Sequence, residues 1–153
     1  MTTRGDDLDR IMAIMDAAFD PAFGEAWNRR QVEDALLMGN CYYGLLDGFC
    51  SKPADDAEAA GFFLSRHGFD EEELLLLAVD PRFRRRGIGR ALMNQFAAYA
   101  KSRGANRLLL EMRSGNPAEL LYRDLGFRPI GKRINYYRSA DGTRIDALTF
   151  ACD

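Results

Sequence analysis

Histidine and cysteine, which carry much of the metal and nucleophilic chemistry in proteins, are scarce in this chain. Among 153 residues there is one histidine, His67, and there are three cysteines, Cys41, Cys50 and Cys152, without a recognisable spacing. A zinc site would need several such ligands, and a Cys–His nucleophile would have to use His67. The sequence therefore argues against a metal centre and a cysteine nucleophile. The odd, unpatterned cysteines favour free thiols in a reducing, cytoplasmic compartment.

Long apolar runs and an excess of one charge are also absent. The longest apolar run, residues 74–79, is far too short to cross a membrane, and no signal peptide is expected. Lysine and arginine number 21 against 23 acidic residues, and the net charge of −2 gives no support to direct nucleic-acid or membrane binding. Length and composition predict a single domain over residues 1–153, and they leave its oligomeric state open.

One stretch of the sequence joins a buried strand to a helix through a basic, glycine-containing loop. The apolar run at 74–79 is followed by Asp80-Pro81, by the loop at 84–90 and by Ala91-Leu92. An uninterrupted apolar run is typical of a strand covered on both faces. Glycines let the backbone approach a ligand, and the first amides of a helix lack internal partners. These amides, the helix dipole and the guanidinium groups together predict a site for phosphate oxygens.

Two common phosphate-binding loops do not fit this stretch. A nucleotide P-loop requires lysine and then serine or threonine after its last glycine, but Arg90 and Ala91 follow Gly89. The dinucleotide fingerprint requires a third small residue where Leu92 stands. The loop therefore departs from both patterns.

A third design, the acyl-CoA loop of the GNAT-type N-acetyltransferases, matches in register at Arg84, Gly87 and Gly89. Together with residues 77–81 before the loop and Ala91-Leu92 after it, the stretch resembles this family. The resemblance implies an α/β GNAT fold, in which a mixed sheet has a splayed parallel strand pair and helices on both faces. It also implies acetyl-CoA as cosubstrate, no metal, and cofactor contacts at Leu77, Ala78, Val79, Arg84, Arg85, Arg86, Gly87, Ile88, Gly89, Arg90 and Asn116.

Hydrophobic periodicity predicts alternating helices and strands along the rest of the chain. The strand at 74–79, a helix at 88–103 and a strand at 107–112 form a strand–helix–strand unit, which implies a parallel pair. The other expected elements are helices at 8–19 and 27–37 and strands at 41–46, 60–66, 127–137 and 143–150.

Two shorter segments carry more specific expectations. Asn116-Pro117 predicts a helix start, with Asn116 as the cap and Glu119 bonded back to it. Capping alone would explain Asn116, so its cofactor contact stays an alternative. The acidic segment at 70–73 predicts a solvated turn, or alternatively a surface that attracts a cationic amine.

Acetyl transfer from a thioester to an amine makes three chemical demands on a protein. The amine must lose a proton, the carbonyl oxygen must be stabilised, and the leaving thiolate must be protonated. By resemblance Glu111 takes the amine proton, the Val79 amide polarises the carbonyl, and Tyr122 protonates the thiolate. A phenol with a pKa of about 10 stays protonated at neutral pH. In the structural alternatives Glu111 pairs with an arginine at the sheet edge and Tyr122 bonds to backbone.

The later part of the chain narrows the resemblance to one branch of the family. Residues 111–113, 121–122, 135–137 and 141–142 are similar to the bacterial enzymes that acetylate the N-terminal alanine of a small-subunit ribosomal protein, although segment 116–122 is slightly shorter. The branch implies a protein N-terminal amine as acceptor, beside Arg133, Tyr136 and Tyr137 on the late strands. Trp27 is a further candidate for the acceptor groove, because it lies on a loop and loops often carry recognition. Direct attack without an acyl-enzyme is expected, since no plausible nucleophile is placed for one.

Other interpretations of the acceptor side stay open. Trp27 could pack the second helix onto the sheet, and the late aromatic residues could simply cover a sheet surface. A small amine or amino acid could replace the protein N-terminus as acceptor. A module that senses acetyl-CoA without turnover is a third hypothesis, and the pair of Glu111 and Tyr122 argues against it.

Overall fold

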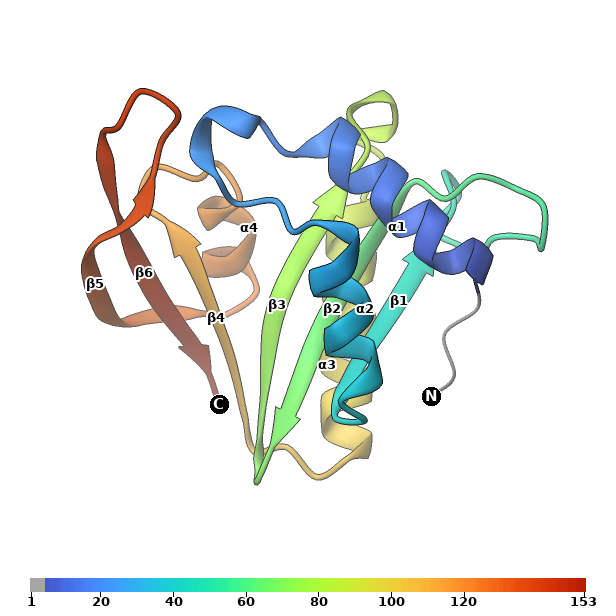
Figure 1. The fold of residues 1–153 in the computed structure, drawn as a ribbon. Coiled ribbons are helices and arrows are strands. Elements are labelled where there is room, and N and C mark those ends of the chain that lie inside the picture. The colour runs from blue at the N-terminus through green and yellow to red at the C-terminus, as the bar shows by residue number, and fades with distance from the viewer. Residues whose placement is uncertain (1–4) are drawn as a thin grey trace.

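The computed structural model describes residues 5–153 as a six-stranded sheet with helices on both faces (Figure 1). None of the helices within this range is long and apolar enough to cross a membrane. The elements are α1 Gly5–Ala18, η1 Pro21–Phe23, α2 Arg29–Leu37, β1 Cys41–Leu46, β2 Gly61–Gly68, β3 Glu71–Val79, η2 Pro81–Phe83, α3 Ile88–Ser102, β4 Arg107–Arg113, α4 Glu119–Asp124, β5 Arg128–Arg138 and β6 Arg144–Cys152.

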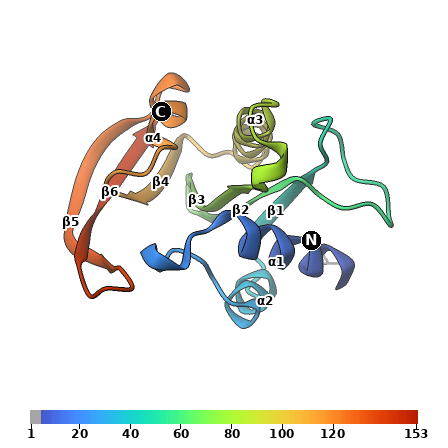
Figure 2. The ribbon, with the colours of Figure 1, turned by 90° about the horizontal axis from the view of Figure 1, so that it is seen from above.

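The strands lie in the order β1-β2-β3-β4-β6-β5, and β3 and β4 form the parallel pair that the strand–helix–strand unit predicts. The other neighbouring pairs are antiparallel. Figure 2 shows α1 and α2 on one face of the sheet and α3 and α4 on the other. The mixed α/β sheet, covered on both sides, confirms the expected fold class.

The parallel pair separates along its length. β3 pairs with β4 from Glu71, opposite Arg107, only as far as Leu74, opposite Leu110. The rest of β3 remains paired with β2, and β4 continues beside β6 as far as Arg113. Figure 1 shows β3 and β4 side by side at their starts and apart at their ends. The sheet therefore opens between two strands whose outer neighbours hold them in place.

Apolar side chains on the two faces of the sheet form separate cores. One core packs α3 and α4 against the sheet through Phe63, Leu92, Phe96 and Phe150. The other packs α1 and α2 through a second set that includes Ile11, Met15, Val32, Phe62 and Leu64. Burial of the sheet on both sides explains why β3 reads as an unbroken apolar run.

The acidic segment at 70–73 differs from the predicted solvated turn, because β3 begins at Glu71. The Glu72 side chain is fully buried, and its carboxylate accepts a hydrogen bond from the Ser65 hydroxyl at 2.7 Å. The carboxylate also lies 2.8 Å from the Arg103 guanidinium and 3.1 Å from Nδ1 of His67. Partners from β2 and from the C-cap of α3 make this burial possible, since a buried charge requires pairing.

Two helix starts also differ from the prediction. α2 begins at Arg29 rather than at residue 27, because Asn28 and Gln31 form a capping box. α4 begins at Glu119, and the Asn116 side chain instead accepts a hydrogen bond from the Ala118 amide at 2.9 Å. The expected return bond from Glu119 to Asn116 is wrong, since the Glu119 carboxylate pairs with Arg123 at 2.7 Å.

The strand predicted at 127–137 is β5, and the bend expected near Pro129 and Gly131 is present as a register shift against β6. A second shift lies between Arg133 and Tyr137, where Asn135 has a positive φ of 56°. The Asn135 amide donates to the Asp146 carboxylate at 2.9 Å, which supports this conformation. This bulge redirects the strand at the residues expected to meet the acceptor.

Candidate active site

A tight turn links β3 to the basic loop. The Asp80 side chain accepts hydrogen bonds from the Arg82 amide at 3.0 Å and from the Arg82 guanidinium at 2.9 Å. The hydrogen bond from the Arg82 side chain lowers the pKa of Asp80 below its ordinary value. This pairing fixes the direction in which the chain leaves the strand and enters residues 84–87.

The loop ends in a helix start without a side-chain cap. Gly87 is the N-cap of α3, with a left-handed φ of 77°, and in the described part of the chain no side-chain cap hydrogen bond closes this helix start. Arg84, Arg85 and Arg86 precede it, and a second positive φ, 65°, lies at Arg85. Uncapped amides, the positive end of the helix dipole and these guanidinium groups can together hold phosphate oxygens.

Two other arginine contacts and Gly89 shape this end of α3. The Arg86 guanidinium lies over the Phe83 ring, 5.2 Å from its centroid, and Arg90 forms an ion pair with Asp124 of α4. A Cβ atom on Gly89 would lie 3.5 Å from the Leu121 side chain, which is an ordinary contact. The protein interior therefore does not require glycine at position 89, whereas close approach of a ligand to the backbone would.

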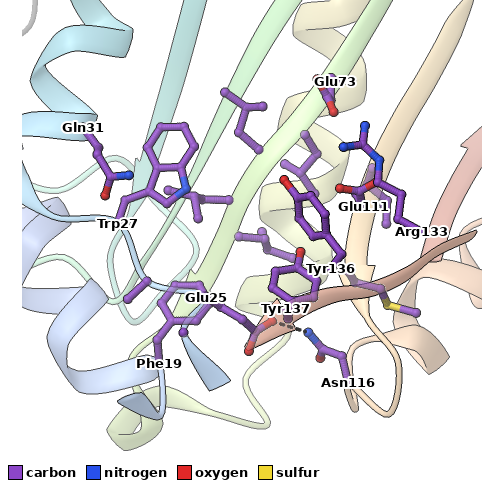
Figure 3. Close-up of a pocket in the computed structure, with 18 of the residues that line it drawn as sticks. Phe19, Glu25, Trp27, Gln31, Glu73, Glu111, Asn116, Arg133, Tyr136 and Tyr137 are labelled. Carbon is purple, nitrogen blue, oxygen red and sulfur yellow. Dashed lines mark hydrogen bonds and ion pairs between the residues drawn. The ribbon is translucent and has the colours of Figure 1, made fainter. Parts of the chain in front are cut away.

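A cleft of about 830 Å³ lies where β3 and β4 separate. Figure 3 shows aromatic and charged side chains from several elements converging over it. The cleft reaches both strands of the parallel pair, the loop between α1 and α2, α4 and β5. It is lined by Phe19, Gly24, Glu25, Ala26, Trp27, Gln31, Arg66, Glu73, Leu74, Leu75, Leu76, Leu77, Leu110, Glu111, Met112, Asn116, Tyr122, Arg133, Tyr136, Tyr137 and Arg138.

Glu111 lies on β4 in the part that has separated from β3, and its side chain lines the cleft. Its carboxylate is 3.1 Å from Nε of Arg133 and accepts a hydrogen bond from the Thr149 hydroxyl at 3.2 Å. The Arg133 side chain is 62% exposed, so this ion pair is largely open to water. Pairing with an arginine, the structural alternative considered for Glu111, is therefore present, with a partner that solvent or a ligand can displace.

Tyr122 projects from α4 and lines the same cleft, although its side chain is almost fully buried. Its ring packs edge-to-face against Phe127, with centroids 6.1 Å apart. Burial, and to a smaller extent the charge of Glu25, raise the pKa of Tyr122 above its ordinary value. The side chain can therefore act as a proton donor toward the cleft.

The residues predicted to meet an acceptor all line the cleft. Tyr136 and Tyr137 pack edge-to-face at 5.1 Å, and the Arg133 guanidinium lies 5.1 Å from the Tyr136 ring centroid. Burial, together with the charges of Glu111 and Glu25, raises the pKa of Tyr137 to about 12. Trp27 both lines the cleft and packs against the α1–α2 core, so its two interpretations are compatible.

Glu25 is a cleft residue that the sequence did not indicate. Its carboxylate lies 2.9 Å from Nε of Arg113 and accepts a hydrogen bond from the Asn116 amide at 3.4 Å (Figure 3). The Arg113 guanidinium also stacks over Phe23, 3.8 Å from the ring centroid. These contacts tie the α1–α2 loop to the end of β4 across a long stretch of sequence. The sequence contains the acidic residue in this loop, but it does not indicate that Arg113 and Asn116 are its partners.

The predicted cofactor residues fall into three groups. Leu77, Ala78 and Val79 lie on the part of β3 that β4 has left, and residues 84–90 form the loop and first turn of α3. Asn116 lies apart from both, on the wall of the cleft, where its side chain bonds to Ala118 and Glu25.

A mixed sheet that opens at its parallel pair, beside an uncapped basic helix start, defines the fold of acyl-CoA-dependent N-acyltransferases. The chain belongs to the acetyltransferase (GNAT) family, whose model matches residues 8–127.

Curated relatives of the chain include the [ribosomal protein bS18]-alanine N-acetyltransferases of Salmonella typhimurium and Escherichia coli. The first is 42% identical over 99 residues and the second 39% over 97, which is 64% and 63% of this chain. The chain spans 66% and 65% of their lengths. The crystal structure of the ribosomal-protein-S18-alanine N-acetyltransferase from Escherichia coli superposes with a TM-score of 0.81 at 29% identity, over 99% of this chain and 90% of that one.

Proposed function

We propose that this chain is an acetyl-CoA-dependent N-acetyltransferase that modifies a protein N-terminus, with the N-terminal alanine of ribosomal protein bS18 as its acceptor. The names of the bacterial relatives support this acceptor. A cleft of about 830 Å³ that is bordered by Trp27, Tyr136 and Tyr137 would accommodate a peptide end. The single observation that carries the proposal is that Glu111 and Tyr122 line one cleft at the opening between β3 and β4.

The residues at this opening fit acetyl-CoA on chemical grounds. The uncapped start of α3 and the arginines before it would hold the diphosphate. The part of β3 at residues 75–79 has no β4 partner, and an amide-containing arm could lie along it as another strand would. Acetyl-CoA supplies the acetyl group as an activated thioester.

One residue of the cleft or of β3 can then meet each of the three chemical demands of the reaction. Glu111 takes a proton from the acceptor ammonium when Arg133 is displaced, and the free amine nitrogen forms a bond to the carbonyl carbon. The Val79 amide donates to the carbonyl oxygen as negative charge develops on it. Tyr122 gives its proton to the sulfur as the carbon–sulfur bond breaks, and the second amine proton restores the phenol through solvent. In total, one ammonium group and one thioester give one amide, one thiol and one proton, which is released.

A thiol-release assay with acetyl-CoA tests this function. The acceptors are a peptide that begins with the N-terminal sequence of bS18, the same peptide with its α-amine blocked, a lysine side-chain peptide and small amines. Turnover with the free alanine-initiated peptide and loss of turnover after blocking support the proposal. Turnover confined to small amines would replace it with small-molecule acetylation, and coenzyme binding without turnover on any acceptor would favour a sensor.

A further inference from the structure

A second carboxylate, Glu25, lies in the cleft with Glu111, and the proposed mechanism gives it no task. Each of its two oxygens has one protein partner, Nε of Arg113 for one and the Asn116 amide for the other. A carboxylate has about four lone-pair sites, so further donors can bind. The Glu25 side chain is only 13% exposed, which makes an ion pair with it stronger than one at the surface.

The partners of the two carboxylates differ in how firmly they are held. Arg113 is 13% exposed and its guanidinium is stacked on Phe23, whereas Arg133, the partner of Glu111, is 62% exposed. A carboxylate whose cation can swing into water is suited to accept a proton during a reaction. A carboxylate fixed by a stacked, enclosed arginine is suited to hold a cation in one place.

The position of Glu25 relative to the tyrosines supports the same assignment, in which Glu25 holds a cation and Glu111 accepts a proton. Its charge acts on the Tyr122 phenol, the proposed proton donor, and on the Tyr137 phenol. The charge of Glu111 acts on Tyr137. Figure 3 shows Glu25 beside Asn116 and Tyr137, and Glu111 nearer Arg133 and Tyr136. Glu25 therefore acts on the proposed proton donor and on a phenol that the proposed base also affects.

We propose that Glu25 binds the ammonium group of the acceptor and thereby makes the cleft selective for a free amine. This inference rests on the proposed function. The acceptor enters as an ammonium ion, pairs with Glu25, and is then deprotonated by Glu111, which leaves the amine positioned for attack. Glu25 neither gains nor loses a proton. Arg113 and Asn116 act as positioning residues, because they hold the carboxylate toward the cleft.

Calorimetric titration in the presence of coenzyme A, which carries no acetyl group to transfer, tests the inference without turnover. The two probes are an alanine-initiated peptide and the same peptide beginning with a propionyl group, which lacks only the ammonium. The wild-type protein is expected to bind the amine form at least about tenfold more tightly. In the Glu25→Gln variant this preference is expected to fall below about threefold, with the affinity for the propionyl peptide little changed.

The matched control is Glu73→Gln, since Glu73 also lines the cleft but pairs with Arg66 at 2.6 Å. It is expected to keep the full preference for the amine. A full preference in Glu25→Gln, or a loss in Glu111→Gln alone, would overturn the inference. If Glu25→Gln does not fold, the double variant Glu25→Gln/Arg113→Gln removes both charges and is judged in the same way. Failure of the wild-type protein to acetylate the peptide would instead refute the proposed function.

Discussion

The two sides of the opening in the sheet are built in different ways. On the proposed phosphate side, β3, the basic loop and the start of α3 follow one another within residues 71–90. On the acceptor side, the cleft combines part of β3 with the α1–α2 loop, the end of β4, α4 and β5. Glu25 reaches Arg113 across 88 positions and Asn116 across 91. One side is therefore a local motif, and the other exists only once the whole chain has folded.

This difference separates two kinds of sequence change. Substitutions in the basic loop at 84–90 are expected to alter backbone conformation and the approach of a phosphate and to leave the cleft intact, since the cleft lining does not include these residues. Substitutions in the assembled cleft are expected to alter charge and shape around the amine and to leave that loop intact. If the two sides are independent, coenzyme binding and acceptor chemistry can be changed separately.

The largest expected effect is at Glu111. The Glu111→Gln variant keeps the shape of the side chain and removes its ability to take a proton, so kcat with the alanine-initiated peptide is expected to fall about 100- to 10,000-fold. Coenzyme A affinity by calorimetry is expected to stay within about twofold, because the phosphate loop is unchanged. Glu33→Gln, on an exposed part of α2, is the control and should retain full activity. Equal losses of kcat and coenzyme affinity would mean that Glu111 is structural and that the two sides are coupled.

Tyr122 lines the cleft from α4 and also packs in the core that contains Ile88, the first residue of α3. Tyr122→Phe is expected to lower kcat about 10- to 100-fold, at the lower end of general-acid effects, because a thiolate is already a fair leaving group. The loss should shrink for a thioester analogue whose leaving thiol is more acidic, which single-turnover rates would reveal. The same loss with both thioesters would assign Tyr122 a packing role.

The sequence was sufficient to predict the local motif, β3 to the start of α3, because the signals of its strand, loop and helix are short-range. The strand at the apolar run, the loop with Gly87 and Gly89 and the helix from Ile88 were predicted to within a few residues. Strand and helix periodicities depend on neighbouring positions, so a short stretch of sequence suffices to place them. The acidic segment at 70–73 misled for the opposite reason. Glu72 is buried by Ser65, His67 and Arg103, and nothing near it in the sequence indicates that these partners converge.

The assembled side could be predicted only where the resemblance to the family supplied the residues. Glu111, Arg133, Tyr136 and Tyr137 were named in this way and do share one cleft. Glu25 was missed, because a single acidic residue on a largely apolar loop has no pattern of its own. The bulge at Asn135 was missed as well, because the Asp146 carboxylate that supports it lies on the next strand.

A smaller effect is expected on the phosphate side at Gly89. In Gly89→Ala the new Cβ makes only an ordinary contact with Leu121, and alanine favours a helix more than glycine does. The free energy of unfolding is therefore expected to rise by up to about 1 kcal/mol. Coenzyme A affinity should nevertheless fall about tenfold, since the methyl group occupies the place where a diphosphate must approach the amides.

Calorimetry and urea unfolding of the same preparation check both parts of the Gly89 prediction. Gly68→Ala is the control, because position 68 lies at the far end of β2 with open space around its Cβ and an ordinary φ. It should leave coenzyme affinity unchanged. Undiminished coenzyme affinity in Gly89→Ala would show that the diphosphate binds elsewhere.

The last expected effect concerns stability at high pH and distinguishes the phenols of Tyr122 and Tyr137. Burial raises the pKa of Tyr122, and burial with the nearby carboxylates raises that of Tyr137 to about 12, against about 10 in an unfolded chain. The folded state therefore resists ionisation of these phenols. Their contribution to the free energy of unfolding is complete below pH 10 and is lost as the pH rises toward the folded pKa values. Each unit between the folded and unfolded pKa values is worth about 1.4 kcal/mol before screening by solvent.

Urea unfolding of the wild type, Tyr122→Phe and Tyr137→Phe at intervals from pH 8 to pH 12 measures these contributions. Both variants should lose less stability than the wild type above pH 10, because each has one phenol fewer to keep neutral. The difference should be larger for Tyr122→Phe, since Tyr122 is almost fully buried in the shared core while Tyr137 lies half-buried on the acceptor side. A larger difference for Tyr137→Phe would show that the cleft excludes water more completely than the core beneath it.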